Sequence, residues 1–288
     1  MSIIVIAGPT GVGKTKLSVS LAKLINGEII NADAMQFYKE LNIGTAKITE
    51  EEKEDVPHHL FDIKEVEEMY TIYDYQKDCR RMIEDIESRG KTPILVGGSG
   101  LYIRAALYDY NLNDEEVVRD FSHLSNEDLY FECLRIDYNC DIHDNNRKRL
   151  ERFLNLKLNG GEIIKDSKPL YEFKMIGLTT NRDNLYSIID KRVDKMVENG
   201  LIEEVKTLYD RGIRSKSVFT GIGYKELYSY FDGEISLEEA IDLIKKNSRH
   251  LAKRQYTFFN NQFDIKWFET NYDNFEETIN EVYNYVKE

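Results

Sequence analysis

Residues 8–15 read Gly8-Pro9-Thr10-Gly11-Val12-Gly13-Lys14-Thr15, and this stretch decides the fold of the chain. It matches the pattern GxxxxGK[ST], it follows a β-branched run at 3–7, and leucines at helical spacing follow it over 14–25. Glycines let backbone N–H groups turn around an anion, and the start of a helix adds partial positive charge. Lys14 supplies a full charge to phosphate oxygens, and the Thr15 hydroxyl can hold Mg²⁺. The alternative, a chance glycine turn, leaves the order of strand, loop and helix unexplained.

Strands and helices alternate along the rest of the chain. We expect strands at 28–32, 93–98, 173–178 and 265–268, and helices at 71–89, 126–159, 183–210, 236–259 and 275–287. This alternation predicts an α/β fold with a parallel, P-loop NTPase-like sheet flanked by helices. The pattern changes near Asn111, because residues 112–128 hold six acids and one Arg. We therefore expect a core formed by 1–110 and 172–288 and a helical insertion at 111–171.

The composition limits the classes of protein to which the chain can belong. It has 288 residues, 39 Lys and Arg against 52 Asp and Glu, and a net charge of −13. Such an acidic chain is not a basic coat for nucleic acid, although a local basic patch remains compatible with it. The three cysteines lack metal-ligand spacing, and no apolar run is long enough to span a bilayer. With no secretion signal at the start, we expect a soluble cytoplasmic protein with no membrane partner.

Asp33 follows the expected strand at 28–32, at the edge where parallel sheets bind their ligands. Its carboxylate could bind Mg²⁺, or it could act as a general base on a bound nucleophile. The alternative is an ordinary helix N-cap, a position at which Asp is favoured. The local sequence leaves these possibilities open.

Three shorter motifs are weaker signals. The segment 42–47, Asn-Ile-Gly-Thr-Ala-Lys, is by itself a loop with a glycine. Adjacent His58 and His59 do not predict zinc, because adjacent side chains diverge and no Cys or Glu completes a ligand set. Residues 97–102, Gly-Gly-Ser-Gly-Leu-Tyr, could form an anion-binding helix start or a tight turn.

The expected helix at 236–259 carries a basic stripe. Lys246, Arg249 and Lys253 fall on one side of it, and an apolar face that includes Ile244 and Leu251 falls on the other. In a chain of net charge −13, this concentration points to phosphates or an RNA backbone. An ordinary solvated helix face is the alternative.

Taken together, the motifs closely resemble those of the tRNA dimethylallyltransferases, which are isopentenyl-diphosphate:tRNA transferases. The resemblance covers nearly the whole chain, in the order of that family. It is carried by GPTGVGKT, INADAMQFYKELNIGTAK, VPHHLFDI, PILVGGSGLYIRA, IHDNNRKRL, IGLTTNRDNLYSIIDKRVDKMVENGLIEEV, GIGYKEL, SRHLAKRQ and Trp267.

The resemblance implies an enzyme that transfers a dimethylallyl group from dimethylallyl diphosphate to the exocyclic amine of the adenosine 3′ of the anticodon. It implies Asp33 as general base, Thr10 as its hydrogen-bonding neighbour, residues 8–15 as the diphosphate site and Thr15 as the Mg²⁺ contact. The implied tRNA contacts are Asp33, Ala34, Met35, Gln36, Ser99, Arg119, Arg147, Arg149, Arg249, Lys253, Arg254 and Gln255. The insertion would clamp the anticodon arm, and a monomer is expected. The target base would have to be flipped out of its stack to react.

The chain departs from the family pattern at several positions. They are Ala34 in place of Ser, His143-Asp144-Asn145-Asn146 in place of His-Pro-Asn-Asp, Arg152-Phe153-Leu154-Asn155 in place of Arg-Ala-Leu-Glu, and Thr220 where many members carry Gln or Arg. Arg104 and Arg119 are the candidate substitutes for a cation at position 220. The departures bear on RNA affinity and rate more than on the class of reaction.

Three rival functions remain. An adenylate isopentenyltransferase would not need a helical insertion or a basic stripe. A small-molecule kinase should show an Arg-bearing lid, and the strand at 93–98 ends in Gly rather than a Walker B Asp. An RNA-binding protein that has lost catalysis would not need an intact loop and Asp33.

Overall fold

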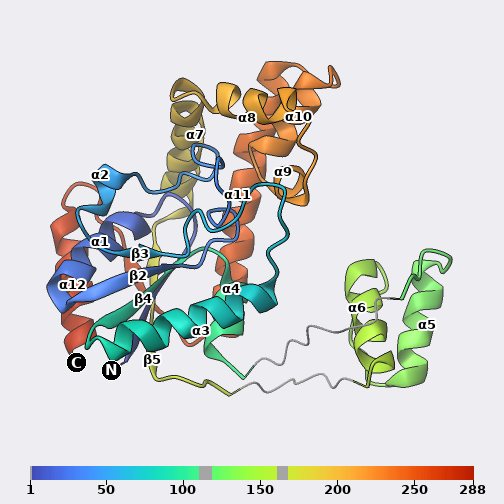
Figure 1. Cartoon of the computed structure of the whole chain (residues 1–288), viewed down its shortest axis with the longest axis horizontal. Helices are drawn as coiled ribbons and strands as arrows, with labels where there is room; N and C mark the ends of the chain where they lie inside the picture. Colours follow the sequence, from blue (N-terminus) through green and yellow to red (C-terminus); the bar gives the residue numbers. More distant parts are fainter. Residues whose placement is uncertain (1, 110–118, 161–167) are drawn as a thin grey trace. The chain divides into compact units, whose positions relative to one another are not determined.

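The computed structural model describes residues 2–109, 119–160 and 168–288 and divides the chain into two compact units (Figure 1). The larger unit combines Met1–Tyr108 with Pro169–Glu288, and the smaller unit is Asp109–Lys168. The expected change of pattern near residue 111 lies outside the described residues.

The larger unit is built on a parallel sheet of six strands in the order β3-β2-β4-β1-β5-β6. The strands are β1 (Ile3–Ala7), β2 (Gly27–Asn31), β3 (His58–His59), β4 (Thr92–Gly97), β5 (Phe173–Thr179) and β6 (Lys266–Glu269). The central strand is β1, where Val5 pairs with Leu95 on one side and Met175 on the other. The expected parallel sheet is confirmed, and its carboxyl ends meet at one edge.

Alternate side chains of β1 pack into two different hydrophobic cores, one on each face of the sheet. Ile4 and Ile6 point into the core that includes α1 (Lys14–Ile25) and α12 (Phe275–Lys287). Ile3 and Val5 point into the core that includes α3 (Ile72–Ser88) and α4 (Gly100–Leu107). Because both faces of the sheet are covered, its inner strands β1, β4 and β5 are largely apolar, as expected for a parallel sheet.

Five helices lie between β5 and β6 in the larger unit. They are α7 (Arg182–Glu198), α8 (Leu201–Asp210), α9 (Lys216–Thr220), α10 (Tyr224–Phe231) and α11 (Leu237–Gln262). Figure 1 shows α7 to α10 gathered around the upper half of the long α11. The single helix expected at 183–210 is wrong, because Gly200 has a φ of 98° and separates α7 from α8. The short helices α2 (Glu50–Lys53), α9 and α10 were not predicted.

The smaller unit pairs two helices, α5 (Asn126–Ile136) and α6 (Arg147–Leu158). Its core includes Leu129, Cys133 and Phe153. The helices expected within 126–159 are confirmed as α5 and α6, and residues 137–146 between them are not helical.

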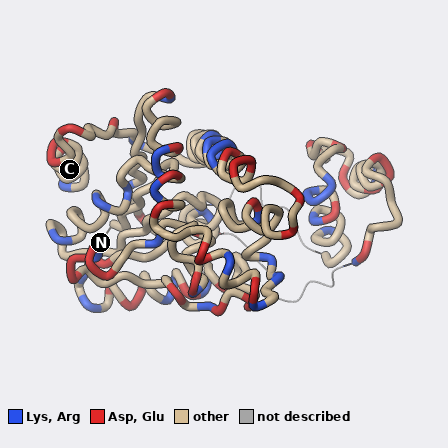
Figure 2. Tube along the Cα trace, turned by 90° about the horizontal axis from the view of Figure 1, so that it is seen from above, with Lys and Arg blue, Asp and Glu red and all other residues tan. Residues whose placement is uncertain are grey.

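The two adjacent histidines have structural partners. His59 Nε2 lies 2.7 Å from a carboxylate oxygen of the buried Glu28, and His58 Nδ1 lies 2.7 Å from the Val56 carbonyl. The described ranges contain no cluster of three metal-ligating side chains. Nor do they contain a helix long and apolar enough to cross a membrane. Figure 2 shows acidic and basic positions interspersed along the chain.

Candidate active site

The loop between β1 and α1 has the backbone of an anion cradle. Gly11 and Gly13 have φ angles of 88° and 92°, a region that favours glycine. A Cβ atom on Gly13 would lie 2.6 Å from the ring of Phe275, so close packing also requires glycine there. Val12 is fully buried and anchors the loop in the core. The predicted strand, loop and helix are confirmed.

Lys14 curls back over this loop. Its Nζ atom donates to the carbonyl oxygens of Gly8 at 3.0 Å and Pro9 at 2.7 Å. Burial, reinforced by the positive charge of Arg192 and opposed by Asp33, lowers the pKa of Lys14 from 10.5 to about 8. A phosphorylated ligand would supply the counter-charge that this ammonium group lacks.

Asp33 stands two residues beyond β2 and faces the same space. The buried side chain of Asn31 fixes its backbone, since Asn31 Oδ1 accepts from the Asp33 N–H at 2.9 Å and Asn31 Nδ2 donates to the Asp33 carbonyl at 3.2 Å. Burial raises the pKa of Asp33, while a hydrogen bond from the Met35 N–H and the charges of Lys14 and Arg192 lower it. A carboxylate with a raised pKa is a better proton acceptor.

Arg192 is the functional candidate that sequence reasoning missed. It lies within α7, and its charge acts on both Lys14 and Asp33. Burial lowers its own pKa, and the Asp33 carboxylate opposes that change. Arg104 does not line the pocket, and its guanidinium donates to the Gln262 carbonyl at 2.9 Å. Arg119 lies in the smaller unit, where its backbone N–H donates to Asn155 Oδ1 at 2.8 Å. Thr220 does line the pocket, and its hydroxyl donates to Lys216 within α9.

These groups share a pocket of about 1200 Å³ in the larger unit. Thr10, Gly11, Gly13, Lys14, Thr15, Asp33 and Arg192 line its polar part, and Val193, Met196, Ile244, Leu251 and Phe258 are among its apolar lining residues. The volume exceeds the roughly 300–1,000 Å³ typical of small-molecule sites, so a nucleobase and a prenyl diphosphate could occupy it together. These apolar side chains suit an alkyl group.

The turn that carries Asp33 is held by two predicted site residues. Ser99, at the start of α4, accepts a hydrogen bond from the Ala34 N–H at 3.1 Å. Gln36 donates from Nε2 to the Thr45 carbonyl at 3.0 Å and so joins the turn to the segment 42–47. Ala34, Met35, Gln36 and Ser99 all line the pocket. Their role as tRNA contacts stays a prediction, and sequence reasoning did not foresee that two of them hold the backbone.

The predicted RNA contacts on α11 lie in different surroundings. Arg254 and Gln255 line the pocket, and Gln255 Nε2 donates to the Gly98 carbonyl at 3.1 Å. In the predicted basic stripe, Lys246 and Lys253 are exposed. Arg249 instead forms a 2.5 Å ion pair with Asp190 on α7, so its charge is partly used between helices.

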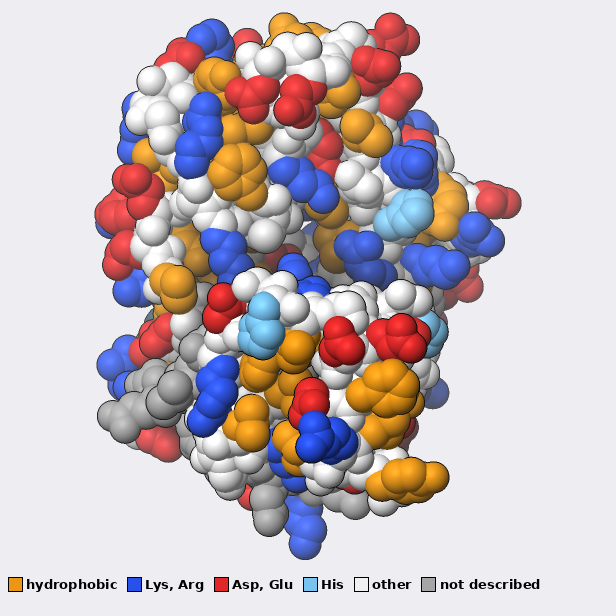
Figure 3. Space-filling view, turned by 90° about the vertical axis from the view of Figure 1, so that its right-hand side faces the viewer, with side chains coloured by type: hydrophobic (Ala, Val, Ile, Leu, Met, Phe, Trp, Pro, Cys, Tyr) orange, Lys and Arg blue, Asp and Glu red, His pale blue; other side chains and the backbone are white. Residues whose placement is uncertain are grey.

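The remaining predicted RNA contacts belong to the smaller unit. Arg147 donates to the carbonyls of Phe121 and Leu124 and forms an ion pair with Glu151, so its guanidinium holds a loop. Arg119 donates to the Asn159 side chain. Arg149 is exposed on α6. Figure 3 shows basic, acidic and apolar side chains intermixed over one face of the surface.

The sheet, the glycine loop and the shared pocket define a P-loop α/β protein that can hold a phosphorylated ligand beside a buried carboxylate. Residues 36–262 match the family described as IPP transferase. A tRNA dimethylallyltransferase from Anoxybacillus flavithermus is 47% identical over 99% of this chain and 96% of the relative, and one from Geobacillus thermodenitrificans is 46% identical with the same coverage. The chain belongs to the IPP transferase family.

Solved structures agree with this assignment. The tRNA isopentenylpyrophosphate transferase from Bacillus halodurans is 44% identical and superposes with a TM-score of 0.79, covering 99% of this chain and 95% of that one. A eukaryotic dimethylallyltransferase solved acting on tRNA is 30% identical, with a TM-score of 0.82 over 93% of this chain and 73% of that one.

Proposed function

We propose that the protein transfers a dimethylallyl group from dimethylallyl diphosphate to the exocyclic amine of the adenosine 3′ of the anticodon in tRNA. The observation that carries the proposal is the meeting of Lys14, Asp33 and Arg192 in one pocket with an apolar wall. Membership of the family and the names of the similar proteins support the same reaction.

In this proposal the diphosphate lies in the loop of residues 8–15. Backbone N–H groups, Lys14 and Arg192 bind its oxygens, and they stabilise the negative charge that grows as the allylic carbon–oxygen bond breaks. The electron pair of that bond leaves with the diphosphate. The apolar lining keeps water from the allylic carbon, which carries developing positive charge.

Asp33 acts on the nucleophile. An adenine amine attacks poorly because its lone pair is delocalised into the ring, so proton transfer must accompany the new carbon–nitrogen bond. The Asp33 carboxylate accepts this proton, and Thr10, which lines the same pocket, is the hydrogen-bonding neighbour that the family resemblance implies. The charges of Lys14 and Arg192 oppose the rise in the pKa of Asp33 that its burial causes.

Mg²⁺ fits the residues present. Thr15 lies in the first turn of α1 and lines the pocket, and the described residues offer no ready-made cluster of acidic ligands. Mg²⁺ commonly binds through one or two protein groups together with substrate phosphates and water. When bound, it would neutralise diphosphate charge, with Thr15 as the protein contact.

The tRNA is the second substrate in this proposal. Gln36, Ser99, Arg254 and Gln255 lie where they can surround a base flipped into the pocket. Lys253 and the exposed Arg149 can bind backbone phosphates. We assign the smaller unit to the anticodon arm. The monomeric state and the cytoplasmic location expected from the sequence stay predictions.

The test incubates the protein with Mg²⁺ and labelled dimethylallyl diphosphate, with unmodified tRNA in one tube and AMP in another. Label should enter tRNA, and the Asp33→Ala variant should lose it while still binding tRNA. Label entering only AMP would identify an adenylate isopentenyltransferase. Label in neither, with tRNA bound, would identify an RNA-binding protein without catalysis.

A further inference from the structure

One carboxylate far from the glycine loop binds the segment 42–47. Glu204, on α8, accepts hydrogen bonds from the backbone N–H groups of Asn42 at 3.1 Å, Ile43 at 2.8 Å and Gly44 at 3.1 Å. It also accepts one from the Tyr224 hydroxyl at 2.6 Å. A carboxylate has about four acceptor positions, so these donors use its full capacity. Glu204 does not line the pocket.

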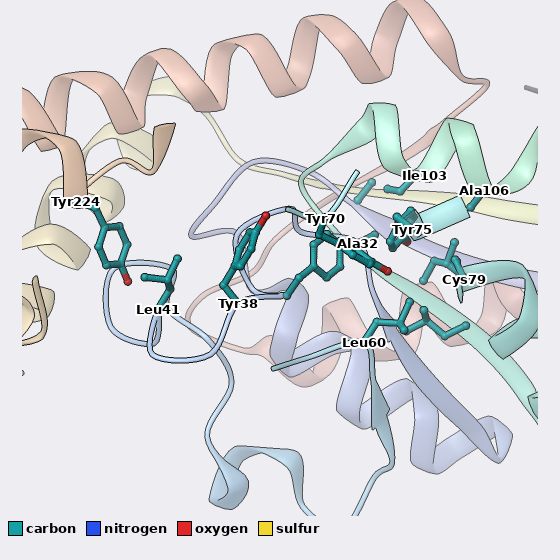
Figure 4. Packing of buried hydrophobic residues seen from close by; sticks show 14 of the residues in the cluster. Ala32, Tyr38, Leu41, Leu60, Tyr70, Tyr75, Cys79, Ile103, Ala106 and Tyr224 are labelled. Atoms are coloured by element: carbon teal, nitrogen blue, oxygen red, sulfur yellow. The ribbon is translucent and has the colours of Figure 1, made fainter. Parts of the chain in front are cut away.

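Tyr224 strengthens this attachment. The tyrosine is buried, and a Cβ atom on Gly44 would lie 2.6 Å from its ring. Figure 4 shows the ring beside Leu41, at the start of the same loop. The segment is therefore fixed to α8, whose Glu204 is 160 residues from Gly44 in the sequence, and to α10 beyond it. Bonds of carboxylates to backbone N–H groups are charge-assisted and about twice as strong as neutral ones.

The other end of the segment reaches the catalytic turn. The carbonyl oxygens of Thr45 and Ala46 accept from Gln36 Nε2 at 3.0 and 3.5 Å. The Gln36 N–H in turn donates to the Asp33 carbonyl at 3.2 Å. Gly44, Thr45, Ala46 and Gln36 all line the pocket. A continuous chain of hydrogen bonds thus runs from Glu204 through the loop and Gln36 to the turn that carries Asp33.

We propose that Glu204 is a positioning residue for the nucleoside side of the site. It sets the segment 42–47 so that Gln36 and Asp33 meet the target adenosine. This inference rests on the proposed function. The diphosphate side has separate supports, since Lys14 is held by Gly8 and Pro9. Loss of Glu204 should therefore affect the tRNA substrate and leave dimethylallyl diphosphate binding intact.

Only a carboxylate can accept all of the hydrogen bonds that converge on Glu204. In Glu204→Gln one acceptor oxygen becomes an NH₂ donor, which would face either two backbone N–H groups or the pair formed by Gly44 and Tyr224. The adjacent Glu203 provides a matched control, because it is exposed on the same helix. Glu203→Gln removes the same charge without touching the loop. Tyr224→Phe removes one of the donors and keeps the ring.

The experiment measures initial rates of dimethylallyl transfer with each substrate varied, after circular dichroism confirms folding. For Glu204→Gln we expect kcat to fall about tenfold or more and KM for tRNA to rise several-fold, because a misplaced catalytic group is costly. KM for dimethylallyl diphosphate should stay within about twofold. Glu203→Gln should match the wild type. Tyr224→Phe should shift the same constants in the same direction but by less, which preserves the test if Glu204→Gln does not fold.

A double-mutant cycle separates positioning from general stability. In a Gln36→Ala background the link to Asp33 is already broken, so adding Glu204→Gln should change kcat by less than about twofold. Additive effects, or a rise in KM for both substrates alike, would overturn the inference. So would Glu204→Gln kinetics equal to those of Glu203→Gln in an active wild-type background. A wild type that transfers no label to tRNA would overturn the proposed function itself.

Discussion

The role of Arg192 can be tested through the pH dependence of the reaction. Replacing it by Gln removes a positive charge that acts on Lys14 and Asp33 together. Its charge lowers the pKa of Lys14, which must be protonated to hold diphosphate, and it lowers the pKa of Asp33, which must be ionised to accept a proton. Without Arg192 both pKa values rise, so both limbs of a bell-shaped pH profile should move to higher pH.

The magnitude follows from the Lys14 site. Burial, with the Arg192 charge second, takes the pKa of Lys14 from 10.5 to about 8, so the basic limb of the wild-type enzyme should lie near that value. Removing the smaller of these two causes should move the limb upward by about 0.5–1 pH unit, which corresponds to roughly 0.7–1.4 kcal/mol. Losing a preorganised donor to the leaving group should also lower kcat/KM about 10²-fold.

The assay measures kcat/KM for labelled dimethylallyl diphosphate at saturating tRNA across the pH range, for the wild type and Arg192→Gln. Arg182→Gln is the matched control, since Arg182 is exposed at the start of the same helix. It should leave rate and profile unchanged. A loss of rate with both limbs unmoved, or an equal loss in Arg182→Gln, would show that the Arg192 charge does not act on Lys14 and Asp33.

Three further perturbations address the base, the loop and the RNA surface. Asp33→Asn should lower transfer about 10²–10⁴-fold and leave tRNA affinity in a filter-binding assay within threefold; a smaller loss would mean that another group accepts the proton. Gly13→Ala should destabilise the protein by about 1–3 kcal/mol in urea unfolding, because of its φ and its contact with an aromatic ring. Gly90 has a φ of 69° and open space around it, so Gly90→Ala should lower the free energy of unfolding by less. Equal losses in the two variants would mean that the ring contact at Gly13 does not affect stability. The double variant Lys246→Glu, Lys253→Glu should weaken tRNA binding and reduce the slope of log K against log[salt] by about two. Unchanged binding would show that this face of α11 does not contact the RNA.

Local signals account for the parts of the fold and site that the sequence predicted. The strand at Ile3–Ala7, the helix at Lys14–Ile25 and the loop between them follow from glycine spacing and periodicity over a few residues. Asp33 was predicted near the phosphate site because parallel strands end at a common edge. The error at 183–210 arose because helical periodicity continues through Gly200. The Asn199-Gly200 pair is itself a turn signal, but the prediction gave more weight to the periodicity on either side of it.

Sequence by itself therefore determined the class of fold, the anion-binding loop and the candidate base, since each depends on backbone preferences within a short window. Only tertiary structure decided that Arg192 reaches Lys14 and Asp33 and that Glu204 binds the segment beginning at Asn42. Charged residues spaced along surface helices look alike in sequence. Whether one of them is solvated, paired with a neighbouring helix or directed into a pocket depends on which distant element packs against its face of the helix.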